Sequence, residues 1–216
     1  MKRLIIVCEG PTEQEFCSSV LMQHLMKFDI VVSAPLVKKS NGGIVSWTSL
    51  RQQILKHLHE RDAIVSMLVD YYGLKDNFMF PGWEESKSIV DKQMRMHYLF
   101  ERMKEDVPEE MRNRFIPYIQ LHEFEGLLFS DINAFRDNFG DNEADFDKIE
   151  NTIHQFANPE DINNNPLTAP SKRLIDAIPG YNKIVYGNIL AERIGLDSIR
   201  RKCPLFNEWV NELENL

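Results

Sequence analysis

Leu4-Ile5-Ile6-Val7-Cys8-Glu9-Gly10-Pro11-Thr12-Glu13, near the start of the chain, is the stretch that decides the fold. Its short apolar run ends in an acid, a glycine and a proline, and a helical pattern follows at once. This order predicts a strand, a turn and a helix, with Glu9 at the exit of the strand. In an open parallel sheet, ligands bind beyond the carboxyl ends of the strands, so Glu9 is the first candidate functional residue.

The other acids of this stretch have a structural explanation. Thr12 and Glu15 are three residues apart, which predicts a capping box, and acids suit the positive N-terminus of a helix. A role in capping therefore accounts for Glu13 and Glu15. It does not account for Glu9, which precedes the turn.

The rest of the chain predicts an α/β fold with a mostly parallel sheet flanked by helices. Helical spacing follows the first strand, residues 30–37 predict a second strand, and residues 47–59 predict a second helix. The continuous apolar run 63–69 is typical of a strand that is buried on both faces. Alternation of strands and helices favours a parallel sheet.

Two further elements complete the predicted core. Residues 84–105 predict one long amphipathic helix, inserted before a fourth strand at 115–121. Pro117 suits an edge position or a bulge in that strand. We therefore expect an α/β core over residues 1–130 and a mainly helical extension over residues 131–216, with Pro204 starting the last helix and Ser171 as the N-cap of an earlier one.

Composition excludes several classes of protein. No apolar run approaches the roughly 18 residues that suggest a membrane span, and the apolar run at the N-terminus is too short for a signal peptide. We therefore expect a cytoplasmic protein without membrane contact. The three cysteines form no CxxC pair, which argues against disulfides and against a thiolate zinc site.

The charge is negative overall but uneven. The net charge of -8 argues against a surface made for nucleic acid, yet residues 171–202 hold seven basic and three acidic residues. A local basic patch can bind phosphates even on an acidic protein. A solvated helical surface would have the same composition.

Acids follow three of the predicted strands: Glu9, Asp70, and Glu123 with Glu125. Parallel strands present their carboxyl ends at one edge of the sheet, so we expect these side chains to converge. Converging carboxylates repel one another unless a cation binds between them. Mg²⁺, or Mn²⁺ in its place, prefers such ligands together with water and phosphate oxygens. Glu13 is a further candidate ligand.

The same positions resemble the Toprim (topoisomerase-primase) superfamily. Glu9, in the string EGPTE, takes the place of the glutamate that ends the first strand of that family. Glu13 resembles the second acid of the overcoming-lysogenization-defect nucleases, and Asp70 occupies the start of the DxD motif. Tyr72 replaces the second aspartate of that motif, and Glu123 or Glu125 would fill the gap.

The whole chain also resembles a bacterial family of Toprim-like proteins that is known as a domain of unknown function. The matching strings span nearly the full length: EGPTE, DYYGL, FPGW, QLHEFE, APSKR, PGYNK and CPLFNEW. The resemblance implies a Toprim-like core and a role linked to mobile elements or phage defence, alongside a partner protein encoded in the same defence operon.

Together these observations predict a metal-dependent nuclease that hydrolyses phosphodiester bonds of nucleic acid. Glu9, Asp70 and Lys172 are the expected catalytic residues. The expected metal ligands are Glu9, Glu13, Asp70, Glu123 and Glu125, and the bases expected to contact the substrate are Lys172, Arg173 and Lys183. The alternative is a non-catalytic Toprim-like module that binds a partner protein or a nucleotide, and Tyr72 favours it.

Overall fold

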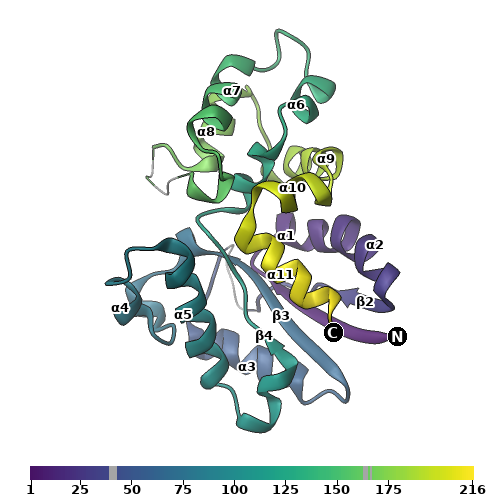
Figure 1. The fold of residues 1–216 in the computed structure, drawn as a ribbon, viewed down its shortest axis with the longest axis vertical. Coiled ribbons are helices and arrows are strands. Elements are labelled where there is room, and N and C mark those ends of the chain that lie inside the picture. The colour runs from purple at the N-terminus through teal and green to yellow at the C-terminus, as the bar shows by residue number, and fades with distance from the viewer. Residues whose placement is uncertain (39–42, 163–164, 166) are drawn as a thin grey trace. The chain divides into compact units, whose positions relative to one another are not determined.

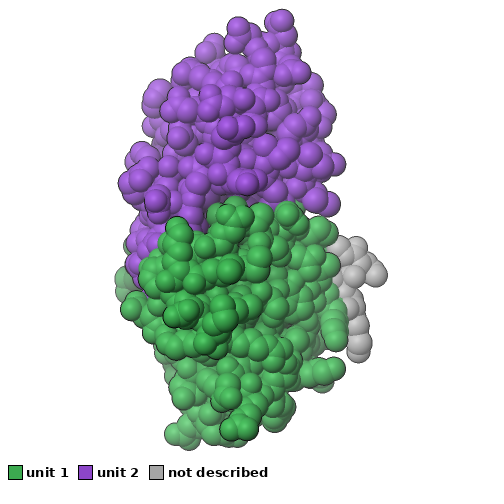
Figure 2. All heavy atoms as spheres, turned by 90° about the vertical axis from the view of Figure 1, so that its right-hand side faces the viewer, with its two compact units in different colours: residues 1–119, 212–216 green, residues 120–211 purple. Residues whose placement is uncertain are grey.

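The computed structural model describes residues 1–38, 43–162, 165 and 167–216. The chain forms two compact units, which Figure 2 shows in green and purple. The first unit holds Met1–Ile119 together with Glu212–Leu216, and the second holds Gln120–Asn211. The second unit thus begins earlier than the predicted boundary after residue 130, and the last residues of the chain belong to the first unit.

A parallel sheet forms the centre of the first unit (Figure 1). The strand order is β2-β1-β3-β4, and β5 also pairs with β3. The pairs β1–β2, β1–β3 and β3–β4 are all parallel. The strands are β1 (Lys2–Cys8), β2 (Ile30–Ser33), β3 (Ala63–Asp70), β4 (Phe115–Ile116) and β5 (Ile119–Gln120).

The two central strands are the most apolar stretches of the chain. Residues 4–8 of β1 are buried, and they pair in register with β3 so that Ile5 lies opposite Val65 and Cys8 opposite Leu68. Burial of such strands on both faces is typical of a parallel sheet covered by helices. The predicted strands at 4–8 and 63–69 are confirmed, and Pro117, which has no N–H to donate, lies where the fourth predicted strand divides into β4 and β5.

Helices flank this sheet (Figure 1). They are α1 (Pro11–Phe16), which continues through a π-helical segment at Cys17–Leu21 into α2 (Met22–Leu25), then α3 (Trp47–Leu58), α4 (Trp83–Ser86) and α5 (Lys92–Glu105). The single helix predicted over 84–105 is therefore wrong: α4 ends at Ser86, and α5 starts anew behind Asp91. The Asp91 side chain accepts a hydrogen bond of 2.8 Å from the Met94 N–H, which is the signature of an N-cap.

The N-cap of the first helix lies two residues before the predicted cap, Thr12. Gly10 is the N-cap of α1, and the Glu13 carboxylate accepts a hydrogen bond of 2.9 Å from the Gly10 N–H. Pro11 occupies the first helical position, where its missing N–H costs nothing. The predicted pairing of Thr12 with Glu15 is wrong, because the residue that reaches back to the cap is Glu13.

The second unit is mainly helical. It contains a 3₁₀ segment at Phe124–Ser130, followed by α6 (Asn133–Asn138), α7 (Phe146–Gln155), α8 (Pro170–Ala177), α9 (Lys183–Ile194), α10 (Leu196–Lys202) and the first part of α11 (Pro204–Glu214). Ser171 lies inside α8, whose N-cap is Ala169, so the predicted Ser171 cap is wrong. Within the described ranges, none of the helices is both long and apolar enough to span a membrane.

Candidate functional site

Glu9 and Asp70 lie where the strand order of the sheet reverses. From β1 the chain moves to β2 on one side, and from β2 it crosses to β3 on the other side of β1. In open α/β sheets, ligands bind outside the carboxyl ends of the strands at such a switch point. Glu9 directly follows β1, and Asp70 is the last residue of β3. Both residues are half-buried.

A hydrogen bond joins these two residues. The backbone N–H of Asp70 donates to Oε2 of Glu9 at 2.9 Å, and the Glu9 N–H donates to the Leu68 carbonyl at 3.0 Å. Neighbouring strand ends therefore fix both the backbone and the carboxylate of Glu9. The expected proximity of Glu9 and Asp70 follows directly from the parallel pairing of β1 with β3.

Gly73 lets the backbone approach the Glu9 carboxylate closely. A Cβ added at Gly73 would lie 3.3 Å from Oε1 of Glu9 and 3.1 Å from Cγ2 of Ile44. A side chain at this position would crowd both groups. The string DYYGL therefore contains both Asp70, at the end of β3, and Gly73, which leaves room for the Glu9 carboxylate.

The Glu13 carboxylate caps the start of α1. The Glu13 side chain is buried, and one of its oxygens accepts the Gly10 N–H bond described above. This geometry supports the capping explanation of Glu13. Its role as a metal ligand stays a prediction.

Glu123 and Glu125 belong to the second unit, and both are buried. The Glu123 carboxylate accepts hydrogen bonds from the Ser171 N–H at 2.9 Å and from the Ser171 hydroxyl at 3.1 Å. Glu123 therefore occupies the N-terminus of α8, where backbone N–H groups favour an anion. The helix start next to Lys172 and Arg173 thus already holds a carboxylate of the same unit.

Glu125 pairs with Lys183. Their side chains form an ion pair of 3.0 Å, and only 2% of the Glu125 side chain is exposed. Burial raises the pKa of Glu125, and the neighbouring charge of Lys183 partly opposes that rise. Lys183, expected to contact the substrate, thus neutralises a buried acid.

The remaining predicted bases differ from one another. Arg173 donates to the Thr168 carbonyl at 2.8 Å and stacks over the Phe156 ring, with 5.3 Å between its Cζ and the ring centroid. Lys172 is exposed, and in the part of the chain that the structure describes its side chain makes no ion pair. Among the described residues, Lys172 is accordingly an exposed base without an ion pair, whereas Arg173 is half-buried and donates to neutral acceptors.

Tyr181 is a polar residue of this region that the sequence reasoning missed. Its hydroxyl oxygen is buried and has no hydrogen-bond partner among the described residues. Burial raises its pKa, and the charges of Glu125 and Glu123 add to the rise. The string PGYNK, which contains both Tyr181 and Lys183, is the sequence feature from which a role for Tyr181 could have been inferred.

The acids do not gather into one ready-made metal site. Across the described residues, no group of three or more His, Cys, Asp and Glu side chains is arranged so that it could hold a metal ion. Glu9 and Asp70 lie in the first unit, whereas Glu123 and Glu125 lie in the second. A cation shared by all of them stays a prediction.

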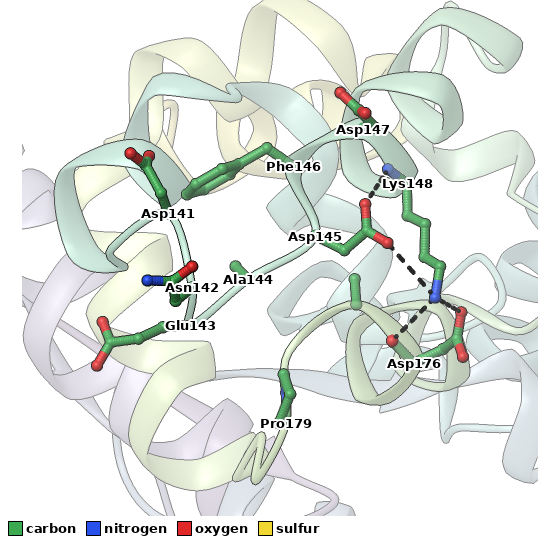
Figure 3. Close-up of a pocket in the computed structure, with 11 residues that line it drawn as sticks. Asp141, Asn142, Glu143, Ala144, Asp145, Phe146, Asp147, Lys148, Asp176 and Pro179 are labelled. Atoms are coloured by element: carbon green, nitrogen blue, oxygen red, sulfur yellow. Dashed lines mark hydrogen bonds and ion pairs between the residues drawn. The ribbon is translucent and has the colours of Figure 1, made fainter.

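The second unit also has an acidic hollow of about 580 Å³ (Figure 3). Its lining includes Asp145, Asp147 and Asp176, together with Lys148. Lys148 forms ion pairs with Asp176 at 2.9 Å and with Asp145 at 3.6 Å, as the dashed lines show. The one basic residue of this hollow is therefore already paired with acids of the same wall.

Comparison with known proteins gives a family. No curated protein and no solved structure matches the chain. A family model matches residues 8–214, which include both acids of the switch point and both acid–donor pairs of the second unit. The chain belongs to the family described as Domain of unknown function (DUF4276).

Proposed function

We propose that the chain is a Toprim-like, Mg²⁺- or Mn²⁺-dependent nuclease that hydrolyses phosphodiester bonds of nucleic acid. The observation that carries the proposal is the placement of Glu9 beside Asp70 at the switch point of a parallel sheet. This is the position at which α/β proteins bind ligands. The EGPTE string supports the Toprim-like assignment.

The residues at the switch point fit a hard divalent cation. Mg²⁺ is commonly held by one or two carboxylates and completes its shell with water and substrate phosphates. Glu9 and Asp70 supply two carboxylates. When bound, the cation would activate water and stabilise charge on the phosphoryl oxygens.

The chain itself contributes orientation and phosphate binding. The Asp70 N–H fixes Oε2 of Glu9, so that carboxylate is held in place before any ligand arrives. Lys172 is exposed and outside any described ion pair, which supports a contact with the nucleic acid backbone. Lys183 plays a supporting part, because it is already paired with Glu125. Arg173, the third base expected to contact the substrate, donates to neutral acceptors of its own unit.

The biological setting is a further part of the proposal. The resemblance to overcoming-lysogenization-defect nucleases supports a role in defence against phage or other mobile elements, together with a partner protein. The assignment of residues to the site does not depend on this biological role.

The second candidate is a non-catalytic Toprim-like module that binds a partner protein or a nucleotide. Two observations favour it. Tyr72 stands where the Toprim motif has its second aspartate, and the acids that would replace that aspartate are bound by Ser171 and Lys183. Because Glu123 and Glu125 already have these partners, they do not require a cation.

Cleavage assays separate the two candidates. Single- and double-stranded DNA and RNA are incubated with the full chain and Mg²⁺ or Mn²⁺, with Glu9→Gln and Asp70→Asn as test variants. Removing one group that stabilises developing charge typically lowers a rate about 10²–10³-fold, so we expect losses of that size in both variants. We expect a similar loss for Lys172→Ala.

Glu15→Gln is the matched control. Glu15 is an exposed acid two residues beyond Glu13, and the same chemical change there should leave the rate unaltered. Gln at position 9 keeps an oxygen that can accept the Asp70 N–H, so the test variant should fold. Absence of metal-dependent cleavage on all four substrates, with a folded wild-type chain, would favour the non-catalytic module.

A further inference from the structure

A second, smaller hollow lies in the second unit. Its volume is about 240 Å³. Phe129 and Ile149 line its apolar side but are each only 1% exposed, while Asn151, Gln155 and Arg173 supply polar groups. Small-molecule sites combine an apolar lining with a few convergent polar groups in this way. The volume suits a small molecule rather than a folded partner.

Three charged residues line this hollow: Lys148 and Asp176, which pair with each other, and Arg173. The Nε–H of Arg173 donates to the Thr168 carbonyl at 2.8 Å, and its Nη1 donates to Oγ1 of Thr152 at 3.3 Å. Both acceptors are neutral. Within the described ranges no carboxylate pairs with Arg173, although this guanidinium is half-buried.

A half-buried charge without a counter-ion is costly. Burial lowers the pKa of Arg173, which reports the loss of hydration around its charged form. Buried charges in proteins are normally paired. The nearest acid along the helix, Asp176, lines the same hollow but forms its ion pair with Lys148 at 2.9 Å instead. The positive charge of Arg173 thus remains available to a ligand.

The packing around Arg173 also prepares it for an anion. Phe156 covers one face of the guanidinium, and the two hydrogen bonds fix its orientation. An arginine held in this way loses little side-chain entropy when it binds a planar or tetrahedral anion. Asn151 and Gln155 are exposed amides that can donate to or accept from the rest of a ligand.

We propose that this hollow is a binding site for a small organic anion, whose phosphate or carboxylate group lies against Arg173. The site goes beyond the proposed nuclease function and does not depend on it. It uses neither Glu9 nor Asp70, so either proposal can fail alone.

Titration of the full chain with phenyl phosphate and with benzoate tests the site, and isothermal calorimetry measures binding. Each probe joins an aromatic ring to one of the two anionic groups, and benzyl alcohol is the neutral control. We expect at least one anion to bind and the alcohol not to bind. Binding of phenyl phosphate alone would assign a phosphate monoester, and binding of benzoate alone would assign a carboxylate.

Two variants test the residues. Loss of a hydrogen bond to a charged group corresponds to about 10–100-fold in affinity, so we expect Arg173→Gln to weaken binding by that factor. Gln155→Glu places a negative charge at the hollow without touching the hydrogen bonds of Arg173, and we expect a similar loss. Arg193→Gln, at an exposed arginine of α9, is the matched control.

Thermal melting of each variant checks that it remains folded. If Arg173→Gln unfolds, the Gln155→Glu variant carries the test. Failure of both anions to bind, equal binding of the alcohol, or undiminished anion binding in a folded Gln155→Glu variant would overturn the proposal.

Discussion

At the scale of single residues, the buried carboxylates of this protein are bound mainly by backbone N–H groups at helix starts. Glu13 binds at the start of α1, Glu123 at the start of α8, and Glu160 at the start of α11. Each bond satisfies a donor that has no partner within its own helix. Glu9 differs because its donor, Asp70, ends a strand. That difference sets Glu9 apart as the candidate for function.

Glu160 should make stability depend on pH. Only 1% of this residue is exposed, and its carboxylate accepts hydrogen bonds from Leu205 and Phe206 at 3.0 and 2.9 Å. Burial nevertheless raises the pKa of Glu160 to about 7 from its ordinary 4.5, although those two bonds oppose the rise. In the unfolded chain the group ionises near the ordinary value.

The direction of the pH dependence follows from the difference between the folded and unfolded pKa values of Glu160. As pH rises from about 4.5 to about 7, the unfolded state loses the proton first, so the free energy of unfolding falls, and above about 7 it falls no further. We expect wild type to lose more stability between pH 6 and pH 8 than Glu160→Gln, measured by urea unfolding. Equal losses in the two proteins would show that Glu160 does not titrate as described.

Lys183 and Lys172 should differ sharply in their effect on stability. Lys183→Ala leaves the buried Glu125 without its cation, which raises the pKa of Glu125 further and costs about 1–3 kcal/mol at pH 8. Lys172→Ala removes an exposed side chain and should stay within about 0.5 kcal/mol of wild type. Urea unfolding of both variants provides the comparison, and similar losses in the two would contradict it.

At the scale of elements, the starts of helices depend on single capping residues. Asp91 accepts a hydrogen bond from Met94 and separates α5 from α4. We expect Asp91→Ala to lower the free energy of unfolding by about 1 kcal/mol. Glu101→Ala, an exposed position inside the same helix, should change it by less than about 0.5 kcal/mol. An unchanged melting curve for Asp91→Ala would mean that the cap does not hold α5.

The strands could be predicted from the sequence more reliably than the helix boundaries. Residues 63–69 form an unbroken apolar run, and such a run has few alternatives to a buried strand. The helical pattern over 84–105, by contrast, continues across the break at residues 87–91, because Ile89 in the break has the same spacing as the apolar residues of α5. The break is set by Asp91 and its local hydrogen bond, which periodicity does not detect.

In the candidate site, too, some contacts could be predicted from the sequence and others could not. The approach of Glu9 to Asp70 could be predicted, since both follow strands that pair in parallel. The pairing of Glu123 with Ser171 and of Glu125 with Lys183 could not be predicted, because the partners lie 48 and 58 residues apart and their contact depends on packing. From the sequence these residues could be recognised only as a set of acids and bases, and the structure shows how Glu123 and Glu125 are bound.

At the scale of the whole molecule, the chain separates the acids at the switch point from the acid–base pairs. The first unit carries Glu9 and Asp70, and the second carries Glu123, Glu125 and their partners. Helix α11 begins in the second unit, and its last residues belong to the first. No feature of the sequence predicts that residues Glu212–Leu216 belong to the first unit.

The central claim is that Glu9 and Asp70 hold a divalent cation. Crystals of the full chain soaked in Mn²⁺ test it most directly, through the anomalous scattering of the metal. We predict an anomalous peak about 2.1 Å from a carboxylate oxygen of each residue, and its loss in Glu9→Gln crystals soaked in the same way. A structure in which Mn²⁺ binds elsewhere on the chain, with no peak between Glu9 and Asp70, would contradict the claim.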